Sequence, residues 1–296
     1  MRSIASSIAL SAIVAALCTG TLAHADSFER TVPADARGEV EIINRGGDVQ
    51  VRGWDRAEVQ IHADVDEDDD ERINVQSGTG RTSINVLRSG REGGSTDMIV
   101  QVPRESTVLI KTVSADQTIT DVRGVQRLQS VSGSINTQVW GADISVRTIS
   151  GDVTVAGHGT AASTEVNTVS GDVNLSNIAG DLNIETVTGD MQIRMPTLTR
   201  GRIQTTNGDL NISASLTADA RLEAEAINGD LGFVFKSPIN IEFDVETLNG
   251  EIDNCFGPKP VRAREFAPGN SLRFKEGTGS ARVRVKTLNG GVEICR

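Results

Sequence analysis

The 296-residue chain contains no tyrosine, and aromatic residues make up only 3% of it. Surfaces that bind carbohydrate or protein tightly usually depend on tyrosine and tryptophan, so this scarcity argues against a site built on aromatic rings. Histidine and cysteine each occur three times. Because a zinc site needs at least three suitable ligands held together, these few scattered residues do not indicate a metal centre.

The usual sequence signs of an enzyme are also missing. No serine or cysteine stands in a recognisable nucleophile elbow. No glycine-rich phosphate loop opens a helix, because the chain shows no convincing amphipathic helix at all. The sequence therefore predicts no catalytic residue, no cofactor-binding residue and no cofactor.

The charge of the chain is acidic, with 40 Asp and Glu residues against 29 Lys and Arg and a net charge of −11. Such a surface repels phosphate backbones, so nucleic acid is not expected as a partner. Beyond the first 25 residues no segment approaches 18 consecutive apolar residues, and we expect no transmembrane segment.

Residues 1–25 resemble a secretory signal peptide. Arg2 gives a positive start, residues 4–17 are mostly apolar, and Ala23-His24-Ala25 places small residues before the expected cleavage. We therefore predict an exported protein that is periplasmic, associated with the cell envelope or secreted, and that begins near Asp26.

A four-residue phrase recurs nine times: a hydroxyl or small residue, an apolar residue, then Ser, Thr or Asn, and usually Gly. Successive copies start 18, 18, 20, 18, 19, 21, 21 and 40 residues apart. The copies begin at Thr112, Ser130, Thr148, Thr168, Thr186, Thr205, Ala226, Thr247 and Thr287. A period near 19 is too short for a pair of helices and suits one coil of a stacked β structure.

Each copy is followed by a polar residue and then by alternating apolar and polar residues, which is the pattern of a half-buried strand. A second alternating segment precedes the next copy. The sequence therefore predicts an all-β fold, a single-chain parallel β-solenoid of the helix or roll type with about 19 residues per coil. One core column should contain Val153, Val173, Met191, Leu210 and Leu231.

The phrase itself should form a tight corner of the coil. Its glycine tolerates a positive φ, and the residue before it can bond to its own backbone. We expect the apolar second residue to point into the core. Stacked coils should also place Thr above Thr and Asn above Asn, in ladders of side-chain hydrogen bonds.

Outside the regular repeat, residues 26–105 contain alternating segments with less strict spacing. We predict that they form a strand-rich part that caps the first coil, and that residues 106–296 form the repeat domain. The interval of 40 residues between the last two copies holds either a degenerate coil or an inserted loop.

These features resemble the bacterial "putative adhesin" family, a domain of unknown function found in exported and envelope-associated proteins. The resemblance rests on the repeated Gly-Asp phrase, the segment from Gly47 to Arg56, the step Val102-Pro103 and the final run from Gly277 to Gly290. It implies surface attachment and supplies no catalytic or binding residues.

Carboxylates are the one chemical group plentiful enough to form a site. Equivalent aspartates follow the glycines of consecutive coils and could bind calcium as a column: Asp152, Asp172, Asp190, Asp209 and Asp230. Each phrase has only one Gly and one Asp, however, which is less than a calcium-binding β-roll repeat contains. We therefore expect solvated aspartates that accept backbone hydrogen bonds at the corners.

Cys255 and Cys295 each lie five residues after the glycine of their phrase. Two ordinary coils between them would separate the Cα atoms by about 9.6 Å, which is beyond the reach of a disulfide. If about 20 of those residues loop out instead, for example as a hairpin through residues 271–287, the two strands become neighbours. The bond would then fasten the last strand, which we expect to be exposed at the end of the stack. The prolines of this interval and the oxidising compartment favour the loop and the bond.

The function expected from the sequence is an exported, non-enzymatic scaffold of the cell envelope, structural or adhesin-like, that contacts an unidentified envelope or surface partner through its strand faces. The alternatives are a β-helix enzyme that acts on polysaccharide and a calcium-binding β-roll. An enzyme should show a groove with converging acidic and basic residues, whereas a scaffold should have flat faces.

Overall fold

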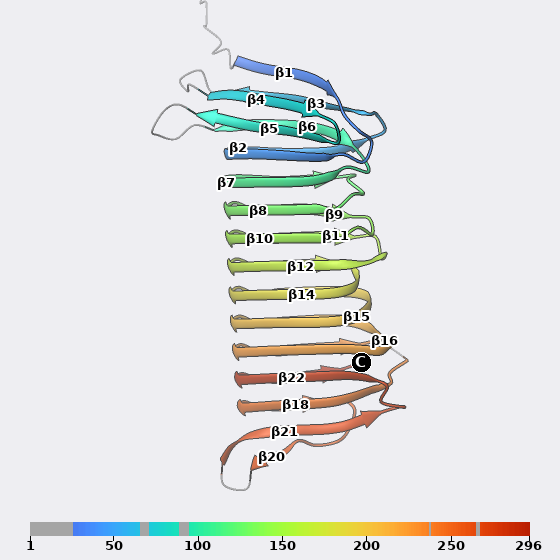
Figure 1. The fold of residues 1–296 in the computed structure, drawn as a ribbon. Helices are drawn as coiled ribbons and strands as arrows, with labels where there is room; N and C mark the ends of the chain where they lie inside the picture. The colour runs from blue at the N-terminus through green and yellow to red at the C-terminus, as the bar shows by residue number, and fades with distance from the viewer. Residues whose placement is uncertain (1–25, 66–70, 89–94, 237, 265–266) are drawn as a thin grey trace, which may run out of the picture.

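The computed structural model describes residues 26–65, 71–88, 95–236, 238–264 and 267–296. The predicted signal peptide, residues 1–25, lies outside them. Every regular element in the described ranges is a β-strand, and there is no helix among them. None of the described residues therefore forms a helix that could cross a bilayer. The strands stack in an elongated, β-solenoid-like column (Figure 1).

Most coils contribute one strand to each of two faces. The front face, nearer the viewer in Figure 1, is a ladder of parallel strands. In spatial order it contains β2 (Glu39–Trp54), β7 (Thr107–Thr120), β8 (Gln126–Ser132), β10 (Ile144–Ser150), β12 (Ala161–Ser170), β14 (Ala179–Thr188), β15 (Met191–Asn207) and β16 (Leu210–Asn228). The back face runs through parts of β7, β15 and β16 and through β9 (Ile135–Val139), β11 (Val153–Gly157), β13 (Val173–Ser176) and β17 (Leu231–Phe235).

The core lies between the two faces. Val153 pairs with Val173, and the same register continues through Met191, Leu210 and Leu231. All five side chains are buried, at 0–1% exposure. The predicted core column is therefore confirmed, because alternation along each strand and equal spacing between coils place the same apolar position in every layer.

The N-terminal end of the stack is closed by antiparallel strands. β1 (Asp26–Pro33) pairs with β3 (Glu58–Val65), which pairs with β6 (Thr96–Pro103). β4 (Glu71–Gly78) and β5 (Arg81–Arg88) form a hairpin beside them. β2 pairs in parallel with β7, across the predicted boundary at residues 105 and 106. That domain boundary remains a prediction.

At the other end, the strands do not stack in the order of the chain. β22 (Ala281–Asn289) lies between β16 and β18 (Ile241–Asn249), in parallel with both. On the back face, β23 (Val292–Cys295) lies between β17 and β19 (Ile252–Asn254). The chain therefore leaves one layer open after β17 and fills it later.

The residues between the two cysteines loop out, as the sequence favours, but not as the hairpin of residues 271–287. β21 (Ala267–Glu276) runs antiparallel to β18 on its outer side and pairs with β20 (Val261–Arg264). It is separated from β22 by β18. The expectation that the last strand is exposed is also wrong, because β23 has a neighbour on each side and β19 is at the edge.

Candidate functional site

Each repeated phrase forms the corner where the chain passes from the front face to the back face. The phrase from Thr168 to Gly171 is representative. The Thr168 side chain is 5% exposed, and its Oγ1 donates to the carbonyl oxygen of Ser170 at 3.4 Å. Gly171 has φ +131°, and a Cβ atom there would lie 2.3 Å from the carbonyl oxygen of Gly151 in the preceding coil. Only glycine allows adjacent coils to approach this closely.

The second residue of the phrase points outward, so the expectation that it is buried is wrong. Val169 is 48% exposed, although Thr168 before it is buried. The register explains this, since Thr168 and Ser170 pair with the next coil while Val169 lies at the bend between them. The same position is exposed in every coil where it is apolar, forming an apolar ridge of Val113, Val131, Ile149, Val169, Val187, Ile227, Leu288 and Leu248.

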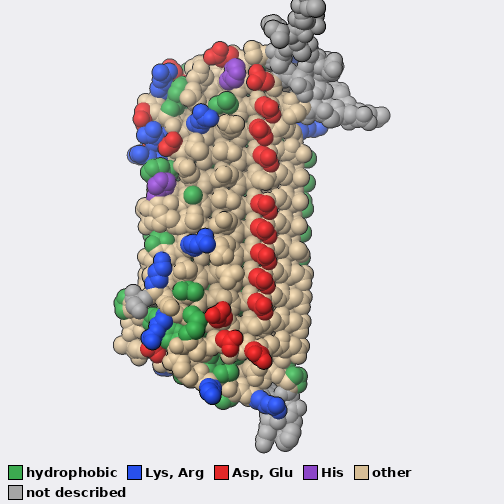
Figure 2. All heavy atoms as spheres, turned by 180° about the vertical axis from the view of Figure 1, so that it is seen from behind, with side chains coloured by type: hydrophobic (Ala, Val, Ile, Leu, Met, Phe, Trp, Pro, Cys, Tyr) green, Lys and Arg blue, Asp and Glu red, His purple; other side chains and the backbone are tan. Residues whose placement is uncertain are grey.

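The aspartates after the glycines form one acidic column on the back face, which runs down the molecule in Figure 2. Each Oδ1 accepts the backbone N–H of the next coil at 2.7–2.9 Å. The acceptors are the five predicted residues Asp152, Asp172, Asp190, Asp209 and Asp230. Among the described residues, no three of these carboxylates bring ligand atoms within 4.8 Å of one another. The five hydrogen bonds link adjacent coils at the corners, and whether the column also binds calcium stays a prediction.

Beside the column, the asparagines of the later coils form the expected ladder. Asn228 donates to Asn207 at 2.7 Å, Asn289 to Asn228 at 2.8 Å and Asn249 to Asn289 at 2.9 Å. Three threonines of the phrase, Thr148, Thr168 and Thr186, donate within their own corner instead. Thr112 and Thr247 donate to the neighbouring coil, and Thr205 Oγ1 and Thr287 Oγ1 have no hydrogen-bond partner among the described residues. The Asn ladder therefore follows the order of the layers in space rather than the order of the chain.

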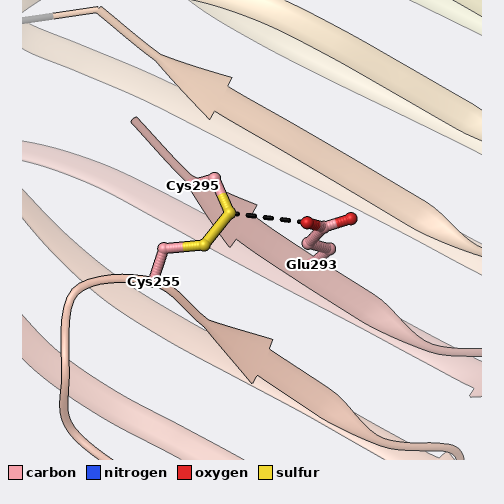
Figure 3. A group of neighbouring side chains, drawn as sticks. All are labelled: Cys255, Glu293 and Cys295. Carbon is pink, nitrogen blue, oxygen red and sulfur yellow. Dashed lines mark hydrogen bonds between the residues drawn. A yellow bond between two sulfur atoms is a disulfide. The ribbon is translucent and has the colours of Figure 1, made fainter.

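Cys255 and Cys295 form a disulfide, with their Cα atoms 4.9 Å apart. Figure 3 shows Glu293 beside it, with its Oε1 3.5 Å from Cys295 Sγ. A disulfide sulfur carries no hydrogen, so this contact is not a donated hydrogen bond, and the bonded sulfurs are not thiolate ligands. The bond ties the edge strand β19 to the inner strand β23.

A wide groove, which we call the arginine groove, opens on the front face over β14, β15, β16, β22 and β18, with a volume of about 830 Å³. Its basic lining residues are Arg200, Arg202, Arg221, Arg282 and Arg284. Its acidic lining residues are Asp181, Glu223, Glu242 and Asp244. Acidic and basic side chains thus converge here, and this front face is not flat as a scaffold was expected to be.

Most of the groove's carboxylates are already engaged by cations. Arg200 donates a hydrogen bond to the Asp181 carboxylate, and this bond raises the pKa of Arg200. Asp244 Oδ1 accepts a hydrogen bond from Arg273 Nε at 2.7 Å, and this bond is the main reason that the pKa of Arg273 is raised. Asp244 Oδ2 also lies 3.4 Å from Arg284 Nη2. By contrast, no ion pair involves Arg202, Arg221 or Glu223 in the described part of the chain.

Sequence reasoning did not find this groove, although a signal was present. Arg200, Arg221 and Arg282 each precede the first residue of their phrase by five positions. Aligning the coils would have shown this recurrence. The sequence order, however, places Glu242 after Arg221, and only the out-of-order position of β22 brings Arg282 next to Arg221.

Outside the groove, two carboxyl groups among the described residues have a lowered pKa. Hydrogen bonds from Arg81 and Lys111 lower the pKa of Glu41, which is 8% exposed, despite the opposing effect of burial. For Glu165, burial acts to raise the pKa, but hydrogen bonds from neighbouring side chains outweigh it and the net shift is downward. Both groups are therefore held as carboxylates by their surroundings.

Residues 34–295 match the family described as Toastrack DUF4097, and the chain belongs to that family. The match agrees with the resemblance to "putative adhesin" proteins. No curated protein matches the chain.

Several solved structures are similar to this chain at low identity. A "putative adhesin" from Bacteroides fragilis NCTC 9343 is 11% identical with a TM-score of 0.43, over 93% of this chain and 100% of that one. Another from Parabacteroides distasonis ATCC 8503 is 11% identical with a TM-score of 0.40, over 92% and 98%. A "putative lipid binding protein" from the same strain is 10% identical with a TM-score of 0.32, over 92% and 97%. Such distant likenesses say nothing about what this chain binds.

Proposed function

We propose that this protein is an exported, non-enzymatic scaffold of the cell envelope that binds an envelope or surface partner through the front face of its strand stack. The observation that carries the proposal is the arginine groove. It is a recess of about 830 Å³ in the front face, and two of its arginines, Arg202 and Arg221, have no ion pair among the described residues. Grooves of this size with a few converging polar groups are typical of binding sites.

The proposed architecture is a single-chain parallel β-solenoid of about 19 residues per coil. Residues 26–105 would cap its start and residues 106–296 would form the repeat, with residues 1–25 removed on export. The parallel pairing at offsets of 18–21 residues from Val153 to Leu231 supports the coil length. A rigid column of this kind can present side chains at fixed spacing along its length.

Cosedimentation tests this function. Purified residues 26–296 are mixed with washed envelope fractions, and the pellet and supernatant are compared. We expect wild-type protein in the pellet and the double variant Arg202→Gln, Arg221→Gln mainly in the supernatant. The matched control is the double variant Arg37→Gln, Arg127→Gln, because both arginines are exposed and lie outside the groove. Wild-type protein that stays in the supernatant would contradict the proposal.

A polysaccharide-acting enzyme is the second candidate, since the groove has the converging acidic and basic residues expected of one. Glycosidic cleavage by acid and base needs two carboxyl groups, one of them protonated. Here Asp181, Glu242 and Asp244 lie in ion pairs, which leaves Glu223 alone among arginines. Release of new reducing ends from acidic polysaccharides, abolished by Glu223→Gln, would support the enzyme and overturn the scaffold.

A further inference from the structure

Three arginines follow one another in a single row of the front face, and we call this the arginine row. Arg200 on β15 pairs in register with Arg221 on β16, which pairs with Arg282 on β22. Neighbouring strands lie about 4.8 Å apart, so the row presents one guanidinium group per layer. At its two ends the register places Asp181 before Arg200 and Glu242 after Arg282.

The row two residues further along the same strands has a different charge pattern. There Arg202, Glu223, Arg284 and Asp244 alternate in sign from layer to layer. Alternation is the stabilising arrangement, because like charges directly opposite each other in a sheet repel. The fold can therefore accommodate alternating charge at this place, and the arginine row departs from it.

The middle of the arginine row has no ion-pair partner among the described residues, although Glu223 lies two residues further along the same face of β16. Arg200 is paired with Asp181, and Arg282 lies 3.7 Å from Glu242, which also contacts Lys275. Arg221 is exposed and has no ion pair within the described residues. Three stacked guanidinium groups with an unpaired centre cost stability in a free protein, and an anion bound along the row would remove that cost.

We propose that the arginine row binds an acidic polysaccharide, whose carboxylates lie along the stack and face successive guanidinium groups. This rests on the proposed binding function and names its ligand class. Arginine matches a carboxylate through two parallel hydrogen bonds. The groove is open along the row and, at about 830 Å³, exceeds what a single small anion fills.

Two further features of the groove select sugar acids over other ligands. Asn183 and Ser163 line it and offer an amide and a hydroxyl group to sugar hydroxyls. No aromatic side chain lines it, so it has no platform on which neutral sugar rings or nucleic-acid bases could stack. Recognition would therefore depend on charge and hydrogen bonding.

The test is direct binding of fluorescently labelled oligogalacturonate to residues 26–296, measured by anisotropy at low salt. We expect binding that weakens as salt is raised, and that is lost with the methyl-esterified oligomer, which has the same sugars without the charge. Arg221→Gln should weaken binding by about tenfold, the loss of one charge-assisted contact. Arg127→Gln, with the same charge change outside the groove, should bind as wild type does.

Thermal denaturation of the same variants separates binding from a structural role. Without ligand, Arg221→Gln should melt at the wild-type temperature or above it, because the substitution removes repulsion within the row. A lower melting temperature together with weaker binding would mean that Arg221 serves the fold, and would overturn the proposal.

Other outcomes would also overturn it: no binding of the oligogalacturonate, equal binding of the esterified oligomer, equally tight binding of a single-stranded oligonucleotide, or binding of inorganic sulfate as tight as that of the oligomer. If the oligomer fails while wild-type protein still sediments with envelope fractions, the ligand class is wrong and the scaffold function stands.

Discussion

At the scale of the residue, each coil places chemically similar side chains in opposite surroundings within a few positions. Val169 lies on the apolar ridge and is 48% exposed, while Val173, four residues later, is buried at 1%. The two valines therefore form a matched pair for substitution.

We expect Val173→Asn to lower the free energy of unfolding by about 3 kcal/mol, because it buries an amide without a partner among apolar neighbours. Val169→Asn should change it by less than about 0.5 kcal/mol, as is usual for exposed positions. Urea denaturation of both variants measures the difference. Equal losses would show that the ridge is covered in solution.

Glu41 gives a prediction for pH. Arg81 Nη2 lies 2.6 Å from Glu41 Oε2, and Lys111 Nζ lies 3.1 Å from Oε1. Since these contacts lower the pKa of Glu41 in the folded state, the stability they add is fully present above about pH 4.5 and is lost as the pH falls through the lower folded-state pKa.

Glu41→Gln should therefore be less stable than wild type at pH 7, and the gap should narrow progressively below pH 4.5. Urea midpoints from pH 7 to pH 3 follow this change. Glu39→Gln is the control, since Glu39 also contacts Arg81, at 3.6 Å, but is more exposed. A gap that stays constant with pH would mean that the ion pairs of Glu41 contribute nothing.

At the scale of the element, the disulfide joins the edge strand β19 to β23 across a sequence separation of 40 residues. In the chain-entropy account, closing a loop of this length stabilises a fold by about 4 kcal/mol. Because stacked repeats depend mainly on their neighbours, we expect the effect to be local.

The double variant Cys255→Ala, Cys295→Ala should lose amide-exchange protection in β18 and β19, while β8 to β14 keep theirs. Hydrogen exchange followed by mass spectrometry measures this by segment, and wild-type protein under reducing conditions should behave like the variant. Two titratable thiols in protein isolated without reductant would show that the bond does not form.

Strand alternation and corner spacing were enough to predict the elements and the core column, because both depend on residues close together in the chain. The outward direction of Val169 could not be predicted from alternation, since a bend at the corner breaks the two-residue period there. The position of β22 could not be predicted either, because nothing local in residues 281–295 indicates which layer they join. The arginine groove was missed for the same reason.

At the scale of the whole molecule, the acidic column runs along the stack, but its carboxylates already accept backbone hydrogen bonds. We therefore expect millimolar calcium to leave the melting temperature nearly unchanged. If calcium bound the folded protein and were present at one hundred times its dissociation constant, it would instead raise the free energy of unfolding by about 2.7 kcal/mol. Differential scanning fluorimetry with and without calcium decides this, and a large rise that disappears in Asp172→Asn, Asp190→Asn would make the protein a calcium-binding roll.

The insertion of β22 and β23 between earlier strands has a consequence for the timing of assembly. As the exported chain emerges from the membrane with its N-terminus first, each coil up to β17 can pack on the one before it. The coil of β18 and β19 cannot pack in this way, because the layer on which it lies consists of β22 and β23, which come last in the chain. The final layers must then form together, and this end of the stack remains open until residue 295 has emerged.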